Sequence, residues 1–490
     1  MTDKGYHDIV IRGATVIDGS GKAGYLADVA VSDGRIADVG ELSGLSGTRE
    51  IEATGLVVAP GFIDSHTHDD RLLLSDPSMA PKASQGVTTV VAGNCGISLA
   101  PLRAQATPPP PLNLLGDEDW YRFDAFGDYL DHLDANPAAL NAIFLVGHMT
   151  LRVGAMDTLD RGASDREIVA MRARLAEALD AGAGGLSTGL FYAPSNSAPT
   201  AEVIALAELL QPVGGVYATH MRNESDRVVE ALEETLEIGR TAGVRVVVSH
   251  HKVQGKGNWG RTKETLAIIE KARADQRIAL DVYPYVAAST VLNPKSVALA
   301  QRTVVASSGA RPDLAGLALD ECARRLGCDE AQAIERLQPA VGIYFSMDEE
   351  DVQRVLGFPG TMIGSDGLAH IETPHPRLWG TFPRVLGHYC RELGLLTLED
   401  AVHRMTGLAA HEYGLTERGL VLPGYHADLV IFDPANVADR ATFEDPIQPA
   451  AGIETVLVNG IPVWSEGRPT GECPGRALRR QELQAAGQKK

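Results

Sequence analysis

Cysteine, positive charge and long apolar runs are all scarce in this sequence. Its five cysteines are odd in number and scattered along 490 residues, which is not a disulfide framework, so we expect a protein of the reducing cytoplasm. Lysine and arginine together number 44 against 64 acidic residues, and the formal net charge is -20. Nucleic acids and anionic membranes bind basic faces, so this charge balance argues against both as partners.

The sequence also lacks the features of membrane insertion and export. No uninterrupted apolar stretch reaches the roughly 20 residues that a membrane-spanning helix needs. Residues 1–8 are polar and lead directly into a strand pattern, so we expect no secretory signal.

What is present is the composition of a soluble globular protein. Apolar residues make up 44% of the chain and charged residues 22%. The length exceeds that of one ordinary domain, but a large α/β barrel with an appendage would use most of it.

Short β segments separated by turn signals occur near both ends of the chain. They fall at residues 8–12, 27–31, 35–39, 427–432 and 454–460. Neither end alone supplies enough strands for a sandwich. We therefore predict one small β-sandwich domain built from residues 1–58 together with 413–475, into which the middle of the chain is inserted. The basic, helix-prone residues 476–490 are expected to form a solvated tail.

The middle of the chain alternates apolar strands with helical patterns, which indicates βαβ units and a parallel sheet. Candidate strands lie at residues 57–63, 87–92, 142–146, 184–187, 215–219, 244–249, 278–282 and 361–364. Eight strands are what a closed barrel requires, so the fold class predicted for residues 59–412 is α/β, a (β/α)8 TIM-like barrel. The connection between the seventh and eighth strands is too long for one helix, and we interpret residues 287–340 as an inserted lid.

Possible metal ligands follow the ends of these strands, which is where the chemistry of such a barrel lies. His66 and His68 follow the first strand and point the same way, because side chains alternate along a strand. Later strand ends supply Cys95, His220, His250 and Asp366. Imidazole, thiolate and carboxylate are all zinc ligands, so the convergence of these residues predicts a metal site.

Each candidate also has a purely structural interpretation. Cys95 could be a small core residue, His220 could bond a buried carbonyl group, and Asp366 could cap the helix that follows it. The joint arrangement is much harder to explain in that way, and we favour the metal site.

Longer segments around these residues carry a family resemblance. They are residues 60–68, 86–96, 220–224, 249–252, 281–285, 364–367, 375–380 and 423–430. Together they resemble the N-acyl-D-amino-acid deacylases, or D-aminoacylases, of the metal-dependent amidohydrolase superfamily, over nearly the whole chain. His66 and His68 mark only the superfamily, whereas residues 94–96 with residues 250–252 are far more specific.

The resemblance implies one tightly held zinc ion bound by Cys95, His220 and His250. It implies a second, weaker or vacant metal position at His66 and His68, and Asp366 as the catalytic acid and base. Many superfamily members bridge two metals with a modified lysine on the fourth strand. Residues 186–189 contain no lysine, which supports the cysteine-based site.

The reaction implied by the resemblance is hydrolysis of the linear amide bond of an N-acyl-D-amino acid, a small-molecule substrate. The residues implied for substrate are Tyr192 at the oxyanion, Lys252, Tyr283 and Arg377 as a clamp on the α-carboxylate, and Ser289 and Lys295 as further contacts. A basic residue at position 295 suggests an acidic side chain, as in N-acyl-D-aspartate or N-acyl-D-glutamate. The D configuration rests on the resemblance alone.

Three alternatives stay open at this point. The first is a deacylase for neutral or hydrophobic side chains. The second is another amidohydrolase, such as a cyclic amidase of the dihydropyrimidinase type or a peptidase, although the missing fourth-strand lysine and the presence of Lys252 and Arg377 weaken it. The third is a non-enzymatic scaffold, which should have lost ligands that this chain retains.

Overall fold

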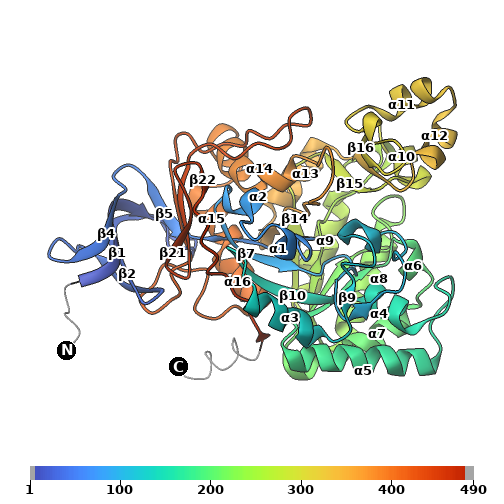
Figure 1. The fold of residues 1–490 in the computed structure, drawn as a ribbon, viewed down its shortest axis with the longest axis horizontal. Helices are drawn as coiled ribbons and strands as arrows, with labels where there is room; N and C mark the ends of the chain where they lie inside the picture. Colours follow the sequence, from blue (N-terminus) through green and yellow to red (C-terminus); the bar gives the residue numbers. More distant parts are fainter. Residues whose placement is uncertain (1–5, 481–490) are drawn as a thin grey trace.

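The computed structural model describes residues 6–480 and arranges them as a barrel, a β domain and a smaller sheet beside the barrel (Figure 1). The barrel strands are β6 (Phe62–Asp64), β7 (Val87–Ala92), β10 (Asn141–Gly147), β11 (Gly185–Gly189), β12 (Val216–His220), β13 (Arg245–Val248), β14 (Ile278–Val282) and β18 (Thr361–Ile363). All neighbours pair in parallel, from β6 at one end of the sheet to β18 at the other. The two ends meet where Ser65 N–H donates to Ile363 O at 3.3 Å. The predicted barrel is confirmed.

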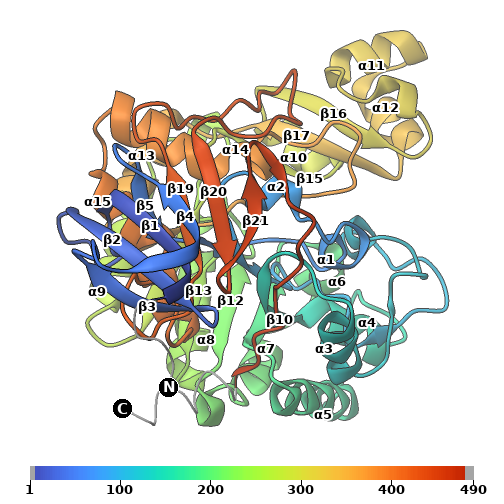
Figure 2. The same ribbon diagram turned by 60° about the vertical axis from the view of Figure 1, so that its left-hand side comes forward.

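Both chain ends build the β domain, as predicted (Figure 2). Its sheet contains β1 (Tyr6–Val16), β2 (Tyr25–Ser32), β3 (Arg35–Gly40), β4 (Ser46–Glu52), β5 (Val57–Pro60), β19 (Leu429–Phe432), β20 (Ile453–Val458), β21 (Ile461–Ser465) and β22 (Arg468–Pro469). The β2–β3 hairpin turns at Asp33 and Gly34, whose φ angles of 51° and 72° are those that an Asp-Gly turn supplies. An apolar core with Ile11, Val29 and Ile431 joins the two chain ends.

The prediction of one strand over residues 57–63 is wrong. β5 pairs with β19 in the β domain, whereas β6 pairs with β7 in the barrel. The chain crosses between the two sheets at Gly61, whose N–H donates to Asp428 O at 2.8 Å. A Cβ atom at Gly61 would lie 2.1 Å from the Thr88 side chain, so a larger residue does not fit there. We predicted that the first segment of the β domain ends at residue 58, but its sheet continues to Pro60, the last residue of β5.

Helices follow the barrel strands and cover their outer side (Figure 1). They are α1 (Leu72–Ser75), α2 (Ala80–Ala83), α3 (Phe126–Ala135), α4 (His148–Ala155), α5 (Asp165–Ala181), α6 (Ala193–Asn196), α7 (Thr200–Ala207), α8 (Val228–Ala242), α9 (Thr262–Ala272), α13 (Glu349–Gly357), α14 (Arg377–Arg384), α15 (Leu398–Met405) and α16 (Gly407–Tyr413). Local sequence signals determine where α5 begins and ends. Ser164 and Glu167 form a capping box at its start, and Gly182 ends it with φ 118°.

The segment between β14 and β18 forms a separate small sheet, which we call the lid. Its strands run β15 (Ala287–Val291), β17 (Ala340–Phe345) and β16 (Arg302–Ser308) in antiparallel order. Helices α10 (Pro294–Leu299), α11 (Leu319–Leu326) and α12 (Glu330–Leu337) accompany it. Leu292, Cys322 and Leu337 belong to its own apolar core. The sheet continues through Phe345, past the limit of residue 340 that we inferred for the insertion.

The start of the predicted solvated tail is packed against the barrel instead. Ala477 pairs with Ala142 of β10, and Leu478 belongs to an apolar cluster with barrel residues such as Val91 and Val247. The prediction rested on the basic residues of this stretch and did not use Ala477 and Leu478, the apolar pair between them. Residues 481–490 lie outside the described part of the chain.

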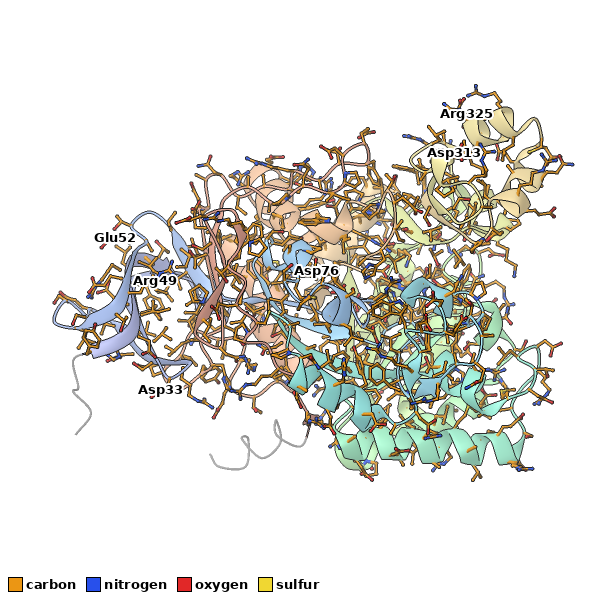
Figure 3. All side chains as sticks on the ribbon, in the orientation of Figure 1. Asp33, Arg49, Glu52, Asp76, Asp313 and Arg325 are labelled. Carbon is orange, nitrogen blue, oxygen red and sulfur yellow. The ribbon has the colours of Figure 1, made fainter. Side chains whose placement is uncertain are left out.

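Charged side chains occupy the outer surface of all three parts. The labelled residues in Figure 3 are all exposed, and they come from the β domain, from the barrel at Asp76 and from the lid at Asp313 and Arg325. Within residues 6–480 no helix combines the length and the apolar character needed to cross a bilayer.

Candidate metal centre

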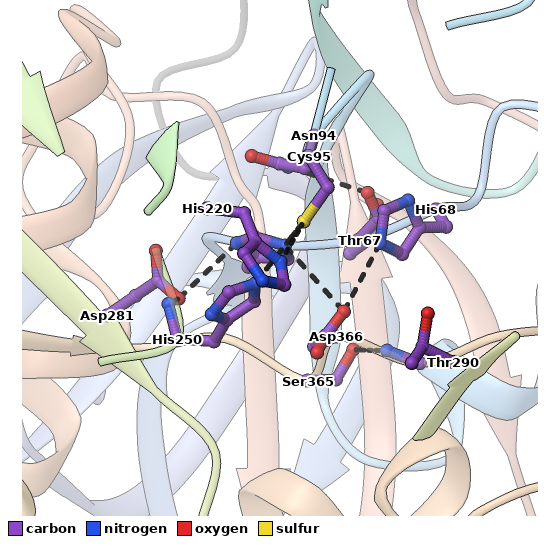
Figure 4. A network of polar contacts seen from close by, with 12 residues as sticks. Thr67, His68, Asn94, Cys95, His220, His250, Asp281, Thr290, Ser365 and Asp366 are labelled. Atoms are coloured by element: carbon purple, nitrogen blue, oxygen red, sulfur yellow. Dashed lines mark hydrogen bonds and ion pairs between the residues drawn. The ribbon is translucent and has the colours of Figure 1, made fainter. Parts of the chain in front are cut away.

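Cys95, His220 and His250 converge although they come from three strand ends (Figure 4). Cys95 Sγ lies 3.3 Å from His250 Nε2 and 3.8 Å from His220 Nδ1. Ligands of one tetrahedral zinc, with bonds of about 2.0–2.3 Å, must lie roughly 3.3–3.8 Å apart. The two distances from the sulfur therefore match those that a shared zinc ion requires, and all three donor atoms lie within 4.8 Å of one another.

A second group of possible ligands shares Cys95 with the first and adds His66, His68 and Asp366. His66 Nε2 lies 3.3 Å from Cys95 Sγ, and Asp366 Oδ1 lies 3.2 Å from His68 Nε2 and 3.7 Å from His66 Nε2. All six candidate ligands from the sequence thus meet at one rim of the barrel.

Charge in this centre favours the ligand form of the thiol. Burial alone would raise the pKa of Cys95, but the adjacent imidazoles of His66 and His250 outweigh it and hold that pKa well below its usual value. Burial alone would likewise lower the pKa of His66, but Asp281 and Cys95 raise it well above normal. A thiolate therefore sits among imidazoles, which is the electrostatic setting for a bound cation.

Three of the six candidates adopt backbone conformations that are rare for residues with a side chain. The φ angles are 53° at Cys95, 36° at His250 and 49° at Asp366. Such left-handed residues are costly and gather at functional sites, where the surrounding structure holds them in place. Here they turn the side chains inward directly after the strands end.

Two carboxylates to which the sequence analysis gave no role contact the histidines of the site. Glu224 Oε1 lies 3.2 Å from His250 Nδ1, and its Oε2 lies 3.5 Å from His220 Nε2. Asp281 Oδ1 accepts the backbone N–H of His250 at 2.7 Å and lies 3.4 Å from His66 Nδ1. Carboxylates behind ligating imidazoles commonly fix ring orientation and tautomer. Both residues lie in segments that carry the family resemblance, 220–224 and 281–285, and Glu224 is also an acid four residues after His220.

Four of the six candidate substrate residues line one cavity next to the candidate metal ligands. Ser289, Lys252, Tyr283 and Tyr192 line it together with Asp366. Lys252 Nζ lies 2.8 Å from Glu224 Oε1 and 2.7 Å from His250 Nδ1. Tyr192 OH lies 2.9 Å from Thr290 Oγ1 of the lid.

Arg377 is fully buried and does not line this cavity itself, but it contacts Asp366 and Ser289, which do. Its Nη1 lies 2.8 Å from Asp366 Oδ2, as an ion pair without the alignment of a hydrogen bond, and its Nη2 donates to Ser289 O at 3.1 Å. Its guanidinium carbon lies 4.6 Å from the centre of the Tyr283 ring. Arg377 thus connects the candidate acid/base to the lid.

Lys295 lies apart from this group. It is exposed on α10 and does not line the cavity, whereas its neighbour Ser296 is buried and does. The helical turn at Asn293, which caps α10 by accepting the Ser296 N–H at 2.9 Å, directs residue 296 inward and residue 295 outward.

The sequence model of the Amidohydrolase family matches residues 49–464. The chain belongs to this family. It is 56% identical to the D-aminoacylase of Alcaligenes xylosoxydans xylosoxydans over 480 residues, which cover 98% of this chain and 99% of that protein. It is 53% identical to the N-acyl-D-aspartate deacylase of the same organism over 472 residues, 96% of this chain and 95% of the other.

A solved structure with the same fold contains both a metal and an inhibitor. It is the N-acyl-D-glutamate deacylase of Bordetella bronchiseptica, complexed with zinc and a phosphonate inhibitor that mimics the tetrahedral intermediate. The TM-score is 0.94 at 45% identity, and the match covers 97% of this chain and 100% of that chain.

In this amidohydrolase the fourth barrel strand, β11, supports the cysteine loop. Ser187 donates a short hydrogen bond to Gly93 O, and its Oγ accepts the Gly96 N–H at 2.9 Å. The strand contains no lysine that could bridge two metals. Its inward-facing hydroxyl instead orients the backbone on both sides of Cys95.

Proposed function

We propose that this amidohydrolase hydrolyses the amide bond of N-acyl-D-amino acids, with zinc as its metal, to give a carboxylate and a free D-amino acid. The observation that carries the proposal is the spacing of Cys95, His220 and His250 beside Asp366, in a chain 56% identical to a D-aminoacylase over nearly its whole length.

The donor set fits zinc better than a hard cation. Cys95, His220 and His250 would hold one zinc tightly, because a thiolate and two imidazoles are soft and borderline ligands. His66, His68 and Asp366 would form a second, weaker metal position. Bound zinc polarises the substrate carbonyl group and lowers the pKa of water towards neutrality.

Asp366 would move the proton of the reaction. Burial alone would raise the pKa of Asp366, but Arg377 and His68 outweigh it and hold that pKa well below its usual value. The carboxylate is therefore ionised at neutral pH and ready to accept the proton of the attacking water. It would then give that proton to the departing amine.

The α-carboxylate of the substrate needs a cationic or hydroxyl partner in a site that is otherwise acidic. Arg377 and Lys252 flank the Tyr283 ring, at 4.6 Å and 5.6 Å from its centre. Ser289 Oγ is buried on the cavity wall and has no hydrogen-bond partner among residues 6–480. These four groups would hold the α-carboxylate, while Tyr192 would face the developing oxyanion.

The side-chain preference depends on the remaining wall of the cavity. This wall is largely apolar and includes Ile97, Leu114, Phe191, Tyr344 and Leu368. An acidic side chain would need a cation there, but Lys295 is exposed outside the cavity. This wall favours a deacylase that accepts neutral or apolar D-amino acids over one restricted to D-aspartate or D-glutamate.

A cytoplasmic location is part of the same proposal. Cys95 must remain a thiolate to bind metal, and an oxidising compartment would threaten it.

A panel of N-acetyl-amino acids tests both parts of the proposal. It includes the D and L forms of leucine, methionine, aspartate and glutamate, assayed by release of the free amine. We expect hydrolysis of D forms only, with leucine and methionine preferred. Activity on L forms alone would overturn the deacylase assignment, and a preference for D-aspartate would restore the acidic hypothesis.

A further inference from the structure

His375 lies at the junction between the lid and the substrate side of the barrel, and both of its ring nitrogens bond backbone groups. Its Nδ1 accepts the Arg377 N–H at 3.0 Å, so this nitrogen carries no proton. The proton must then lie on Nε2, which is 3.0 Å from Ala287 O and donates to it. One neutral tautomer satisfies both contacts.

The second contact falls on the free edge of the lid sheet. In the part of the chain that the structure describes, β15 pairs only with β17 in the strand order β15-β17-β16, so its other edge has no strand partner there. Carbonyl groups two residues apart in a strand point to the same edge. On that edge Ala287 O accepts from His375 and Ser289 O accepts from Arg377. The two side chains together dock β15 onto the barrel.

Aromatic packing fixes the imidazole ring in this position. The ring is 3% exposed, and its centroid lies 4.9 Å from that of Phe443 and 5.1 Å from that of Tyr285, both edge-on. Phe443 comes from the C-terminal part of the chain and also contacts Phe345 of the lid at 4.7 Å between centroids. His375 is thus enclosed from the lid, the barrel and the C-terminal segment.

We propose that His375 is a positioning residue for substrate binding. It holds the backbone of Arg377 and the edge of β15 in one arrangement, so that the Arg377 guanidinium and the Ser289 hydroxyl meet the substrate α-carboxylate together. The proposal rests on the proposed function, because it assigns the α-carboxylate to Arg377 and Ser289. Within the described residues His375 makes no hydrogen bond to the six candidate metal ligands, and it reaches the nearest of them, Asp366, only through Arg377, so we expect zinc binding to be retained without it.

The decisive experiment compares N-acetyl-D-leucine with N-acetyl-D-leucinamide, which lacks the negative charge. His375→Phe keeps the ring packing and removes both hydrogen bonds. We expect its preference for the acid over the amide, as a ratio of kcat/KM, to fall about tenfold, mainly through KM, since hydrogen bonds to charged groups have effects of this size. Zinc content should be unchanged. His375→Gln, whose amide N–H can reach the Ala287 carbonyl, should regain part of the ratio.

Amide hydrogen exchange measures the docking of β15 without depending on enzyme activity. In His375→Phe we expect faster exchange in β15 and no change in the barrel strands. The matched control is His403→Phe, because His403 Nδ1 also bonds a backbone carbonyl, Gly19 O at 2.8 Å, but in α15. This control should leave the acid-to-amide ratio and β15 exchange as in the wild type.

The outcomes separate the two proposals. If His375→Phe lowers activity on acid and amide equally, or loses zinc, His375 has no positioning role and the inference is wrong. If the wild type hydrolyses neither compound, the proposed function fails. The exchange of β15 then still decides whether His375 docks the lid strand.

Discussion

Cys95 differs from the other buried thiols in what surrounds its sulfur. Its neighbours are imidazoles, which lower its pKa, whereas the Sγ of Cys322 faces Leu314 O in the apolar core of the lid, and burial raises the pKa of that thiol. A low pKa makes a thiol a metal ligand, and a raised one makes it an inert core residue. The same residue type therefore has two roles in one chain.

Replacing the sulfur tests the first role. We expect Cys95→Ser to retain less than about a tenth of the zinc of the wild type after dialysis against a weak chelator, because a hydroxyl does not ionise to replace the thiolate. Elemental analysis of the purified protein measures this. The control Cys322→Ser should keep its zinc. Equal zinc in both variants would remove Cys95 from the metal site.

Glu224 supports the ligands without being one of the convergent donors. It contacts His220, His250 and Lys252, and these neighbours outweigh the effect of burial and hold its pKa well below the usual value. Glu224→Gln should weaken zinc binding about 10- to 100-fold, as the loss of an outer carboxylate commonly does. Competition with a chromogenic chelator measures the affinity. The control is Glu234→Gln, a substitution on α8 that breaks the ion pair between Glu234 and Arg222. Identical zinc affinities for the two variants would contradict the role of Glu224.

At the scale of elements, α4 and α7 are joined through one buried carboxylate. Glu202 Oε1 lies 3.0 Å from His148 Nε2 and bonds Arg152 Nη1, and its Oε2 accepts the Ala163 N–H at 2.8 Å. Burial alone would raise the pKa of Glu202, but these contacts outweigh it and lower that pKa to about 2.

The lowered pKa predicts how stability changes with acid. A folded-state pKa below the ordinary value of 4.5 contributes stability that is fully present above about pH 4.5 and is lost as the pH falls to about 2. Denaturant unfolding from pH 6 to pH 2.5 measures the slope. Glu202→Gln should be less stable at pH 6 and show a flatter decline. Glu208→Gln, an exposed acid paired with Arg172 at 3.4 Å, should follow the wild type. Parallel curves for wild type and Glu202→Gln would contradict the assignment.

A second buried pair joins the β domain to the barrel. Asp428, at the start of β19, pairs with Arg418 and accepts from Asn141 Nδ2 of β10 at 3.3 Å. Arg418→Met leaves this carboxylate buried without its cation, which should lower the free energy of unfolding by about 3 kcal/mol. Thermal unfolding followed by circular dichroism measures the change. The control Arg311→Met, which breaks the exposed pair with Asp313, should lower the free energy of unfolding by less than about 1 kcal/mol. Equal losses for the two variants would show that the contact between the β domain and the barrel does not depend on the pair of Arg418 and Asp428.

At the scale of the whole molecule, the sequence predicts the barrel and the convergence of the six candidate ligands because both follow from simple periodicities. Parallel strands end at one rim, and residues after those ends must meet there. Glu224 and His375 lack such a signal, since they lie on loops whose course the pattern of the chain does not determine. Asp281 lies within β14, one residue before the strand end, and not among the residues after strand ends where ligands are expected. The single strand expected at residues 57–63 failed because an apolar run does not reveal a change of sheet. Lys295 lies outside the cavity because one residue of helix phase separates it from the inward-facing Ser296, a difference that the sequence does not reveal.

The central claim is that one zinc ion, held by Cys95, His220 and His250, makes this chain a deacylase of N-acyl-D-amino acids. The most direct test is to strip the protein of metal, add zinc in fractions of an equivalent, and follow release of D-leucine from N-acetyl-D-leucine. We predict no release without zinc and a linear rise that breaks near one equivalent per chain. Full activity in the stripped protein, or none at any zinc level, would contradict the claim.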